Sequence, residues 1–246
     1  MTPNIKIITA IDGRVPITKA FCVASKRIKD TFGIDTHAVV TNTDKENVEM
    51  CKQYGVHYIK HINKPLGRKW NAVVDSLREV DFTHLIVLGS DDIVANSFIE
   101  QLPLEHDVSG NHDLWFWGMN PNRAGYFTFG YWRGTKGRVG GVGRTISRRI
   151  IEDMDYKLWA DDKNYGMDGN MIVNIKSKCK GIDWYSYSLK ETNTFAMDVK
   201  YGHNISSLSP TLRNTELCEP EDVLYKHLPE DEINYLMQIR DNTVRR

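Results

Sequence analysis

The first hundred residues alternate between short apolar runs and longer segments in which apolar residues recur every three or four positions. The apolar runs have the length of buried strands and comprise Ile5–Ala10, His37–Val40, Val56–Lys60 and His84–Leu88. The segments between them have the spacing of amphipathic helices, with apolar stripes in Ile17–Ile28, Val48–Tyr54 and Leu66–Leu77. Strands that alternate with helices in this way predict βαβ units and a mainly parallel sheet.

The pattern changes after residue 92. Leu114–Met119 and Tyr126–Trp132 are rich in aromatic residues and predict strands of a mixed or antiparallel region. Helical spacing returns in Ser147–Met154 and in Asp168–Ile175. The charged tail is expected to contain a further helix, with Pro229 at its start.

The composition narrows the class of protein. Of the 246 residues, 41% are hydrophobic and 26% are charged, as in an ordinary soluble globular protein. The formal net charge is zero, so no overall field favours nucleic acid or a membrane surface. The four cysteines are scattered without a CxxC pair, which argues against a structural zinc site and fits a reducing compartment. Without a signal-peptide pattern or an apolar stretch long enough to span a membrane, we expect a cytoplasmic protein.

The run from His84 to Ile93 ends its apolar part in two adjacent carboxylates, Asp91 and Asp92. Open α/β sheets bind ligands just beyond the carboxyl ends of their strands, which is where this pair falls. Adjacent carboxylates repel each other, so a cation is expected nearby, and a divalent metal that bridges a diphosphate is the economical candidate. The alternative is a plain acidic loop after a core strand.

Four motifs follow one another along the chain: Gly89–Asp92, Gly137–Arg144, Tyr165–Met171 and Asp198–Asn204. Taken in this order, they resemble the GT-A glycosyltransferases, in particular the family-2-like members that use nucleotide sugars. The resemblance implies a three-layer α/β/α, Rossmann-like fold with a mainly parallel mixed sheet over residues 1–215. Residues 1–92 would form the nucleotide-binding half and 93–215 the acceptor and catalytic half, followed by a helical extension over 216–246.

The resemblance also implies a metal site for Mn²⁺ or Mg²⁺. Asp92 would ligate the metal, with Ser90 and Asp91 beside it facing the donor, and His203 would complete the metal shell or contact the diphosphate. Carboxylate oxygens suit these hard cations, and neutral imidazole suits Mn²⁺. Gly89 stands where members of the family often carry aspartate, which leaves the division of roles between Asp91 and Asp92 open.

The second and third motifs concern the sugar and the acceptor. Gly141 belongs to a stretch similar to the glycine loop that lines the donor sugar, where glycine permits close approach of the backbone to a ligand. A flexible hairpin is the alternative. Asp168 takes the position of the catalytic base, a carboxylate that accepts the proton of the acceptor hydroxyl and implies inversion of configuration. A helix N-cap is the alternative for this aspartate.

The amino-terminal half is expected to hold the nucleotide. Asn63–Asn71 resembles the Arg-Asn helix start of the family, and basic side chains at a helix N-terminus favour phosphate. A solvated helix start is the alternative. Asn42 stands near the place where relatives carry the aspartate that reads uracil, so the base is left open, with a UDP-sugar as the expected donor. The predicted donor-binding residues are Thr9, Ala10, Asp12, Asn42, Arg68, Lys69, Asn71, Ser90, Asp91 and Gly141.

The acceptor is predicted from a cluster of basic and aromatic residues, of which Trp132, Arg138 and Arg144 are the expected contacts. The basic members of the cluster are Arg133, Lys136, Arg138, Arg144, Arg148 and Arg149. Basic residues interleaved with aromatic ones can grip phosphates and stack bases. Two acceptors follow: a hydroxymethylated DNA base, as in small phage glycosyltransferases, or a carbohydrate held on aromatic rings.

The sequence thus predicts a metal-dependent, inverting glycosyltransferase that moves a sugar from a nucleotide-sugar donor to an acceptor hydroxyl. A sugar-phosphate nucleotidyltransferase is one rival, although its glycine-rich first loop is missing because Ile11–Pro16 contains one glycine. A non-catalytic sugar- or nucleic-acid-binding domain is the other. Such a domain would not need Asp92, Asp168 and His203 in this order.

Overall fold

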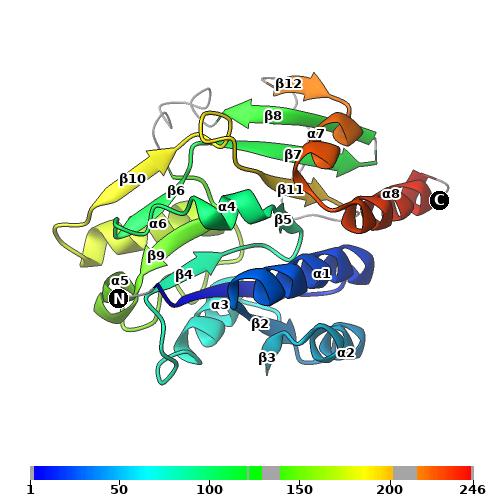
Figure 1. Ribbon diagram of the computed structural model, residues 1–246. Coiled ribbons are helices and arrows are strands. Elements are labelled where there is room, and N and C mark those ends of the chain that lie inside the picture. The colour runs from blue at the N-terminus through cyan, green and yellow to red at the C-terminus, as the bar shows by residue number, and fades with distance from the viewer. Residues whose placement is uncertain (1–2, 121, 129–138, 202–214, 245–246) are drawn as a thin grey trace.

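The computed structural model describes residues 3–120, 122–128, 139–201 and 215–244 (Figure 1). Its main sheet has seven strands in the order β10-β6-β9-β4-β1-β2-β3. These strands are β1 (Ile5–Ile11), β2 (Asp35–Thr41), β3 (His57–His61), β4 (His84–Val87), β6 (Val108–Asn111), β9 (Arg144–Ser147) and β10 (Trp184–Tyr187). Only β9 runs antiparallel to its neighbours, β4 and β6. The mainly parallel sheet is confirmed.

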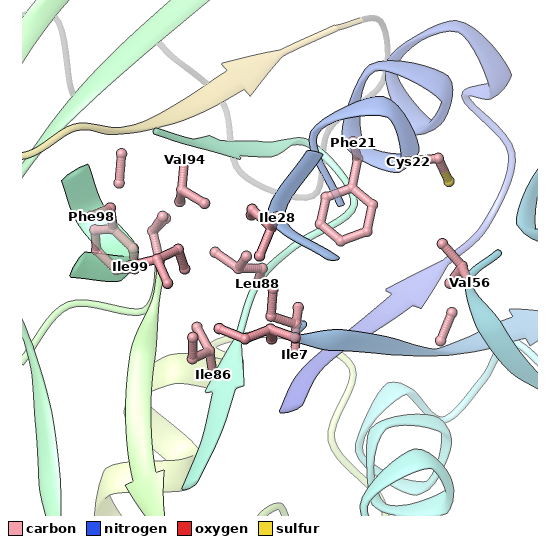
Figure 2. Close-up of a cluster of buried hydrophobic side chains, with 14 of the residues drawn as sticks. Ile7, Phe21, Cys22, Ile28, Val56, Ile86, Leu88, Val94, Phe98 and Ile99 are labelled. Carbon is pink, nitrogen blue, oxygen red and sulfur yellow. The ribbon is translucent and has the colours of Figure 1, made fainter. Parts of the chain in front are cut away.

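Helices cover both faces of this sheet. On one face lie α1 (Val15–Phe32), α2 (Lys45–Tyr54) and α4 (Asn96–Glu100), and on the other α3 (Leu66–Asp75), α5 (Arg148–Asp153) and α6 (Met167–Lys178). Successive residues of a strand point to opposite faces. Ile7 of β1 accordingly packs in the cluster that holds Phe21 of α1 (Figure 2), whereas Ile8 packs in the cluster that holds Val73 of α3. The predicted three-layer α/β/α arrangement is confirmed.

A second sheet has the strand order β12-β8-β7-β11-β5 and stands beside the main one (Figure 1). Its strands are β5 (Asp92–Val94), β7 (Asp113–Met119), β8 (Asn122–Thr128), β11 (Ala196–Lys200) and β12 (Thr215–Cys218). The expected helical tail contains α7 (Pro220–His227) and α8 (Glu230–Val244). It packs onto the rest of the chain, because β12 pairs with β8 and Arg27 of α1 donates to Glu232 of α8 at 2.7 Å.

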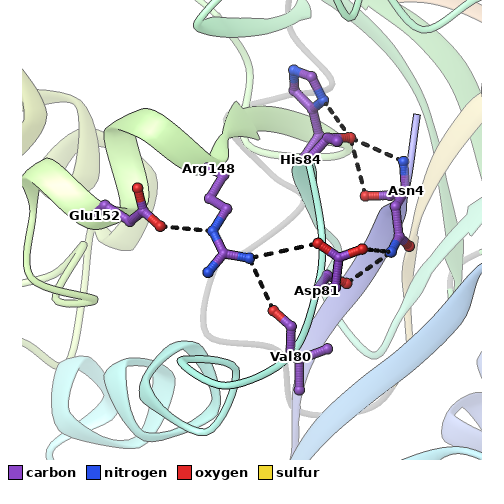
Figure 3. Close-up of polar contacts among 7 residues, drawn as sticks. Asn4, Val80, Asp81, His84, Arg148 and Glu152 are labelled. Atoms are coloured by element: carbon purple, nitrogen blue, oxygen red, sulfur yellow. Dashed lines mark hydrogen bonds and ion pairs between the residues drawn. The ribbon is translucent and has the colours of Figure 1, made fainter. Parts of the chain in front are cut away.

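Two arginines of the predicted basic cluster lie at the amino end of β4. Arg148 donates to Glu152 at 2.7 Å and to the carbonyl of Val80 at 3.1 Å (Figure 3). Arg149 is paired with Asp107. Because β9 is antiparallel to β4, with Ser147 opposite His84, both arginines lie at the end of the sheet opposite Asp91 and Asp92. The described part of the predicted cluster therefore does not form one basic surface.

Among the described residues, no helix combines the length and the apolar composition needed to cross a membrane.

Candidate functional site

Three carboxylates meet where the two sheets adjoin. Asp91 and Asp92 follow β4, and Asp92 is also the first residue of β5. Strand β11 runs antiparallel to β5 and places Asp198 directly opposite Asp92. One carboxylate oxygen from each of the three side chains lies within 4.8 Å of the other two. We call these residues the aspartate cluster.

Gly89 lets two of these carboxylates approach the backbone. A Cβ at residue 89 would lie 2.8 Å from Oδ1 of Asp91 and 3.1 Å from Oδ2 of Asp92, which is closer than side chains normally approach. The backbone N–H of Gly89 also donates to Oδ2 of Asp92 at 2.6 Å. The glycine at the position where relatives often carry aspartate thus belongs to the local geometry of the pair.

The charges of the cluster fit a divalent cation. Burial, together with Asp198 and Asp91, raises the pKa of Asp92 well above its usual value. Burial also raises the pKa of Asp198 to about 6, with Lys200 acting against the shift. One buried oxygen of Asp198, Oδ1, has no hydrogen-bond partner in the part of the chain that the structure describes. A buried oxygen of this kind among repelling carboxylates is the donor set that Mg²⁺ and Mn²⁺ prefer.

Two cations that the sequence analysis did not single out border the cluster. Arg14 donates to Asp91 at 2.7 Å and to the hydroxyl of Ser90 at 3.2 Å. Lys200 lies 2.5 Å from Oδ2 of Asp198. Asp198 was also missed as a ligand, although it opens the fourth motif. The available signal was a charged residue inside the otherwise apolar run Phe195–Val199.

Several predicted donor-binding residues meet at the carboxyl ends of the first strands. Lys69 is buried and donates to the carbonyl of Ile11 and the hydroxyl of Thr41, both at 2.7 Å, and to Asn63 at 3.0 Å. It therefore ties together the ends of β1 and β2 and the residues after β3. Burial lowers the pKa of Lys69 to about 8, and Asp12 and Asp44 act against this shift.

The other predicted donor-binding residues of the amino-terminal half lie partly at the exposed edge of the main sheet and partly in the protein core. Asp12 is exposed and accepts from Asn63 at 2.7 Å, and Asn42 is exposed just after β2. Arg68 is exposed on α3, and Ala10 is half-buried in β1. Thr9 is completely buried. Its hydroxyl oxygen has no hydrogen-bond partner among the described residues.

The prediction for Asn71 needs correction. Its side-chain nitrogen donates to the carbonyl of Trp159 at 2.8 Å and to Asp161 at 2.9 Å, and its side-chain oxygen accepts from the backbone N–H of Trp159 at 3.0 Å. The amide is therefore fully engaged within the protein. Asn71 therefore joins α3 to the segment after α5, and its amide is not available to bind the nucleotide sugar.

The structure places Asp168 beside Gly141. A Cβ at residue 141 would lie 2.2 Å from Cγ of Asp168, so only a glycine leaves room for this carboxylate. Asp168 is exposed in the first turn of α6, where the N-cap is Gly166. The capping alternative for Asp168 is therefore wrong. Asp168 also contributes to the raised pKa of Asp198, which places its charge near the aspartate cluster.

The prediction of Arg144 as an acceptor contact is corrected by its burial. The side chain is completely buried. It donates to the carbonyl of Asp168 at 3.3 Å and to that of Val139 at 3.2 Å, which joins the glycine stretch to the start of α6. Arg144 thus holds the backbone of Asp168 through this hydrogen bond, and its buried side chain cannot contact an acceptor. The remaining predicted site residues, Trp132, Arg138 and His203, lie outside the described residues.

Comparison with known proteins places this geometry in a known fold. No protein-family model and no curated protein matches the sequence. In structure, the chain is similar to glucosyl-3-phosphoglycerate synthase from Mycobacterium tuberculosis in complex with Mn²⁺ and UDP-glucose, with a TM-score of 0.54, 9% identity and coverage of 85% of this chain and 74% of that one. It is also similar to TarS from S. aureus, with a TM-score of 0.54, 12% identity and coverage of 80% of this chain and 36% of that one. The chain therefore shares the fold of these two proteins, and the GT-A fold that its four motifs predict is confirmed.

Proposed function

We propose that this protein is a metal-dependent glycosyltransferase that uses a UDP-sugar as its donor. The observation that carries the proposal is the aspartate cluster in a GT-A fold, together with the exposed carboxylate of Asp168, whose charge acts on Asp198. The similar synthase binds Mn²⁺ and UDP-glucose, which supports the same ligands here.

In the proposed mechanism, Asp91, Asp92 and Asp198 hold Mn²⁺ or Mg²⁺. When bound, the cation neutralises the charge that develops on the departing diphosphate. Arg14 and Lys200 keep the carboxylates in place through their ion pairs. His203 remains a predicted further ligand.

Asp168 acts on the acceptor. Its carboxylate accepts the proton of the acceptor hydroxyl while that oxygen attacks the anomeric carbon and the nucleoside diphosphate departs. A single base on the side opposite the leaving group implies inversion of configuration. Gly141 makes room for this carboxylate, and Arg144 fixes the backbone that carries it.

The nucleotide occupies the edge formed by the ends of β1, β2 and β3, where Asp12 and Asn42 are exposed and Lys69 holds the strand ends together. We propose uracil as the base because the similar synthase binds UDP-glucose.

The described residues favour a carbohydrate hydroxyl over DNA as the acceptor. Arg144 is buried, and Arg148 and Arg149 are paired with acidic residues at the far end of the sheet. The described arginines of the predicted basic cluster therefore form no common surface for the phosphates of DNA. The four cysteines are all free, which supports our placement of the protein in the cytoplasm.

A panel of nucleotide sugars tests the proposal, with thermal stabilisation and release of the nucleoside diphosphate measured in the presence of Mn²⁺. We expect a UDP-sugar to raise the melting temperature and to be hydrolysed slowly, and Asp92→Asn to abolish both effects. Release of pyrophosphate from a nucleoside triphosphate would indicate a nucleotidyltransferase instead. Stabilisation without any release of UDP would indicate a binding domain.

A further inference from the structure

A second cavity lies away from the aspartate cluster. It has a volume of about 520 Å³ and lies between α1, the start of α4, the turn before β11 and the end of α7. The lining residues that matter here are Arg27, Asn96, Ser97, Asn193, Lys226 and His227. Arg27 follows Arg14 by thirteen residues along α1. At 1.5 Å per residue the Cα atoms of these two arginines are about 20 Å apart, and the lining contains neither a member of the aspartate cluster nor Asp168. The cavity is therefore not part of the proposed active site.

The lining is positively charged. Of the described residues that line it, Arg27 and Lys226 are charged and none is a carboxylate. Arg27 is compensated from outside the cavity by Glu232, at 2.7 Å. Lys226 is exposed and forms no ion pair with any residue that the structure describes. The cavity therefore carries an uncompensated positive charge.

The lining also holds hydrogen-bond donors that the protein does not use. The hydroxyl oxygen of Ser97 is buried and has no partner among the described residues. The side-chain oxygen of Asn96 accepts from Arg27, which leaves its NH₂ group available. The side-chain amide of Asn193 is likewise not hydrogen-bonded to any part of the chain that the structure describes. Of these groups only the Ser97 hydroxyl is buried, whereas Asn96 is half-buried and Asn193 is exposed. A buried hydroxyl without a partner is costly, so a ligand that accepts a hydrogen bond from Ser97 would remove that cost, and the two amides offer further donors at the rim.

We propose that this cavity binds a phosphomonoester of metabolite size. A phosphate group presents several acceptor oxygens and a double negative charge, which matches one lysine and donors that converge from α4, α7 and the turn before β11. The volume exceeds that of a phosphate ion and falls in the range of small-molecule sites, about 300–1,000 Å³. This inference goes beyond the glycosyl transfer proposed above and does not depend on it.

Titration calorimetry of the full chain with glycerol 3-phosphate, and separately with inorganic phosphate, tests the site in the absence of Mn²⁺ and nucleotide. We expect saturable binding of glycerol 3-phosphate that weakens about tenfold or more in Lys226→Met, because a charge-assisted hydrogen bond is lost. Ser97→Ala should weaken binding severalfold without lowering the melting temperature, since its hydroxyl has no partner to lose.

Two matched variants control the experiment. Lys180→Met removes the same charge from an exposed position outside the cavity and should bind as the wild type does. Asp92→Asn should also bind normally, which separates this site from the proposed active site. Absence of binding at millimolar ligand, equal binding in Lys226→Met and wild type, or equal losses in Lys226→Met and Lys180→Met would each overturn the proposal.

Discussion

Replacing Gly141 with alanine should displace the proposed base without unfolding the protein. The added Cβ would lie 2.2 Å from Cγ of Asp168 and 2.2 and 2.4 Å from its carboxylate oxygens. Ordinary contact begins at 3.4 Å, so the carboxyl group has to retreat by about 1.2 Å, the difference between 3.4 and 2.2 Å. Asp168 is exposed in the first turn of α6, so its side chain can rotate away while the helix stays in place.

The displacement should appear in the rate and not in the stability. A misplacement of about 1 Å at a reacting group costs about a hundredfold in rate. We therefore expect kcat for UDP release to fall by about that factor in Gly141→Ala. Its Kd for the UDP-sugar should change little, because the new methyl group points at Asp168. Stability should change by about 0.5 kcal/mol or less, as for other surface substitutions.

Gly169→Ala is the matched control. It adds the same methyl group next to Asp168 in the sequence, but at a place with no atom within 4 Å. It should keep the wild-type kcat and stabilise α6 by up to about 1 kcal/mol. Steady-state kinetics with Mn²⁺, calorimetry with the UDP-sugar and thermal melts give the three quantities. A wild-type kcat in Gly141→Ala, or an equal loss in Gly169→Ala, would refute the assignment of Asp168 as the base.

Three further changes test other parts of the molecule. Asp198→Asn should abolish the stabilisation by Mn²⁺ in thermal melts, since it removes one of the three carboxylates proposed to hold the metal; an undiminished Mn²⁺ response would exclude Asp198 as a ligand. Asp168→Asn should abolish transfer and preserve the calorimetric Kd for the donor, and retained turnover would contradict its role. Burial and then His57 lower the pKa of His37 from 6.5 to about 4, so unfolding takes up a proton between these values and stability falls as the pH drops through them. Between pH 7 and pH 5, the free energy of unfolding of His37→Asn, measured with urea, should therefore fall by about 1 kcal/mol less than that of the wild type. An identical pH dependence of the two proteins would contradict this prediction.

The amino-terminal half of the fold could be predicted because each of its elements is long enough to show its own period. The predicted strand Ile5–Ala10 is observed as Ile5–Ile11, and the helical stripe Ile17–Ile28 lies inside α1. In a βαβ unit the strand, the helix and the next strand follow one another in sequence. Local pattern therefore carries most of the information that this half needs.

The second half contains short strands that carry no such signal. Strand β9 has the sequence Arg-Thr-Ile-Ser, and the sequence pattern predicts no strand there: Arg144 ends the glycine-rich stretch and Ser147 begins a predicted helix. Four residues are too few to show the apolar–polar alternation of a strand, and three of these four are polar. The strand exists because β4 and β6 supply its hydrogen bonds from either side. The burial of Arg144 was missed for the same reason, since arginine is expected at the surface when nothing local indicates otherwise.

The aspartate cluster combines a predictable part with an unpredictable one. Asp91 and Asp92 could be found because they end a single apolar strand. Asp198 reaches them only through the pairing of β5 with β11, which lies about a hundred residues later in the chain, and no local pattern sets the register of that pairing.

The charges of the complete aspartate cluster explain why the binding of the metal and the binding of the nucleotide-sugar donor should depend on each other. Among the described residues, three carboxylates face two cations, Arg14 and Lys200, so the cluster carries one net negative charge when all three carboxylates are ionised. A divalent cation reverses that sign to a net positive charge, which is what a diphosphate requires. Loss of Asp198, the ligand that only tertiary pairing supplies, should therefore weaken the binding of the metal and of the nucleotide together.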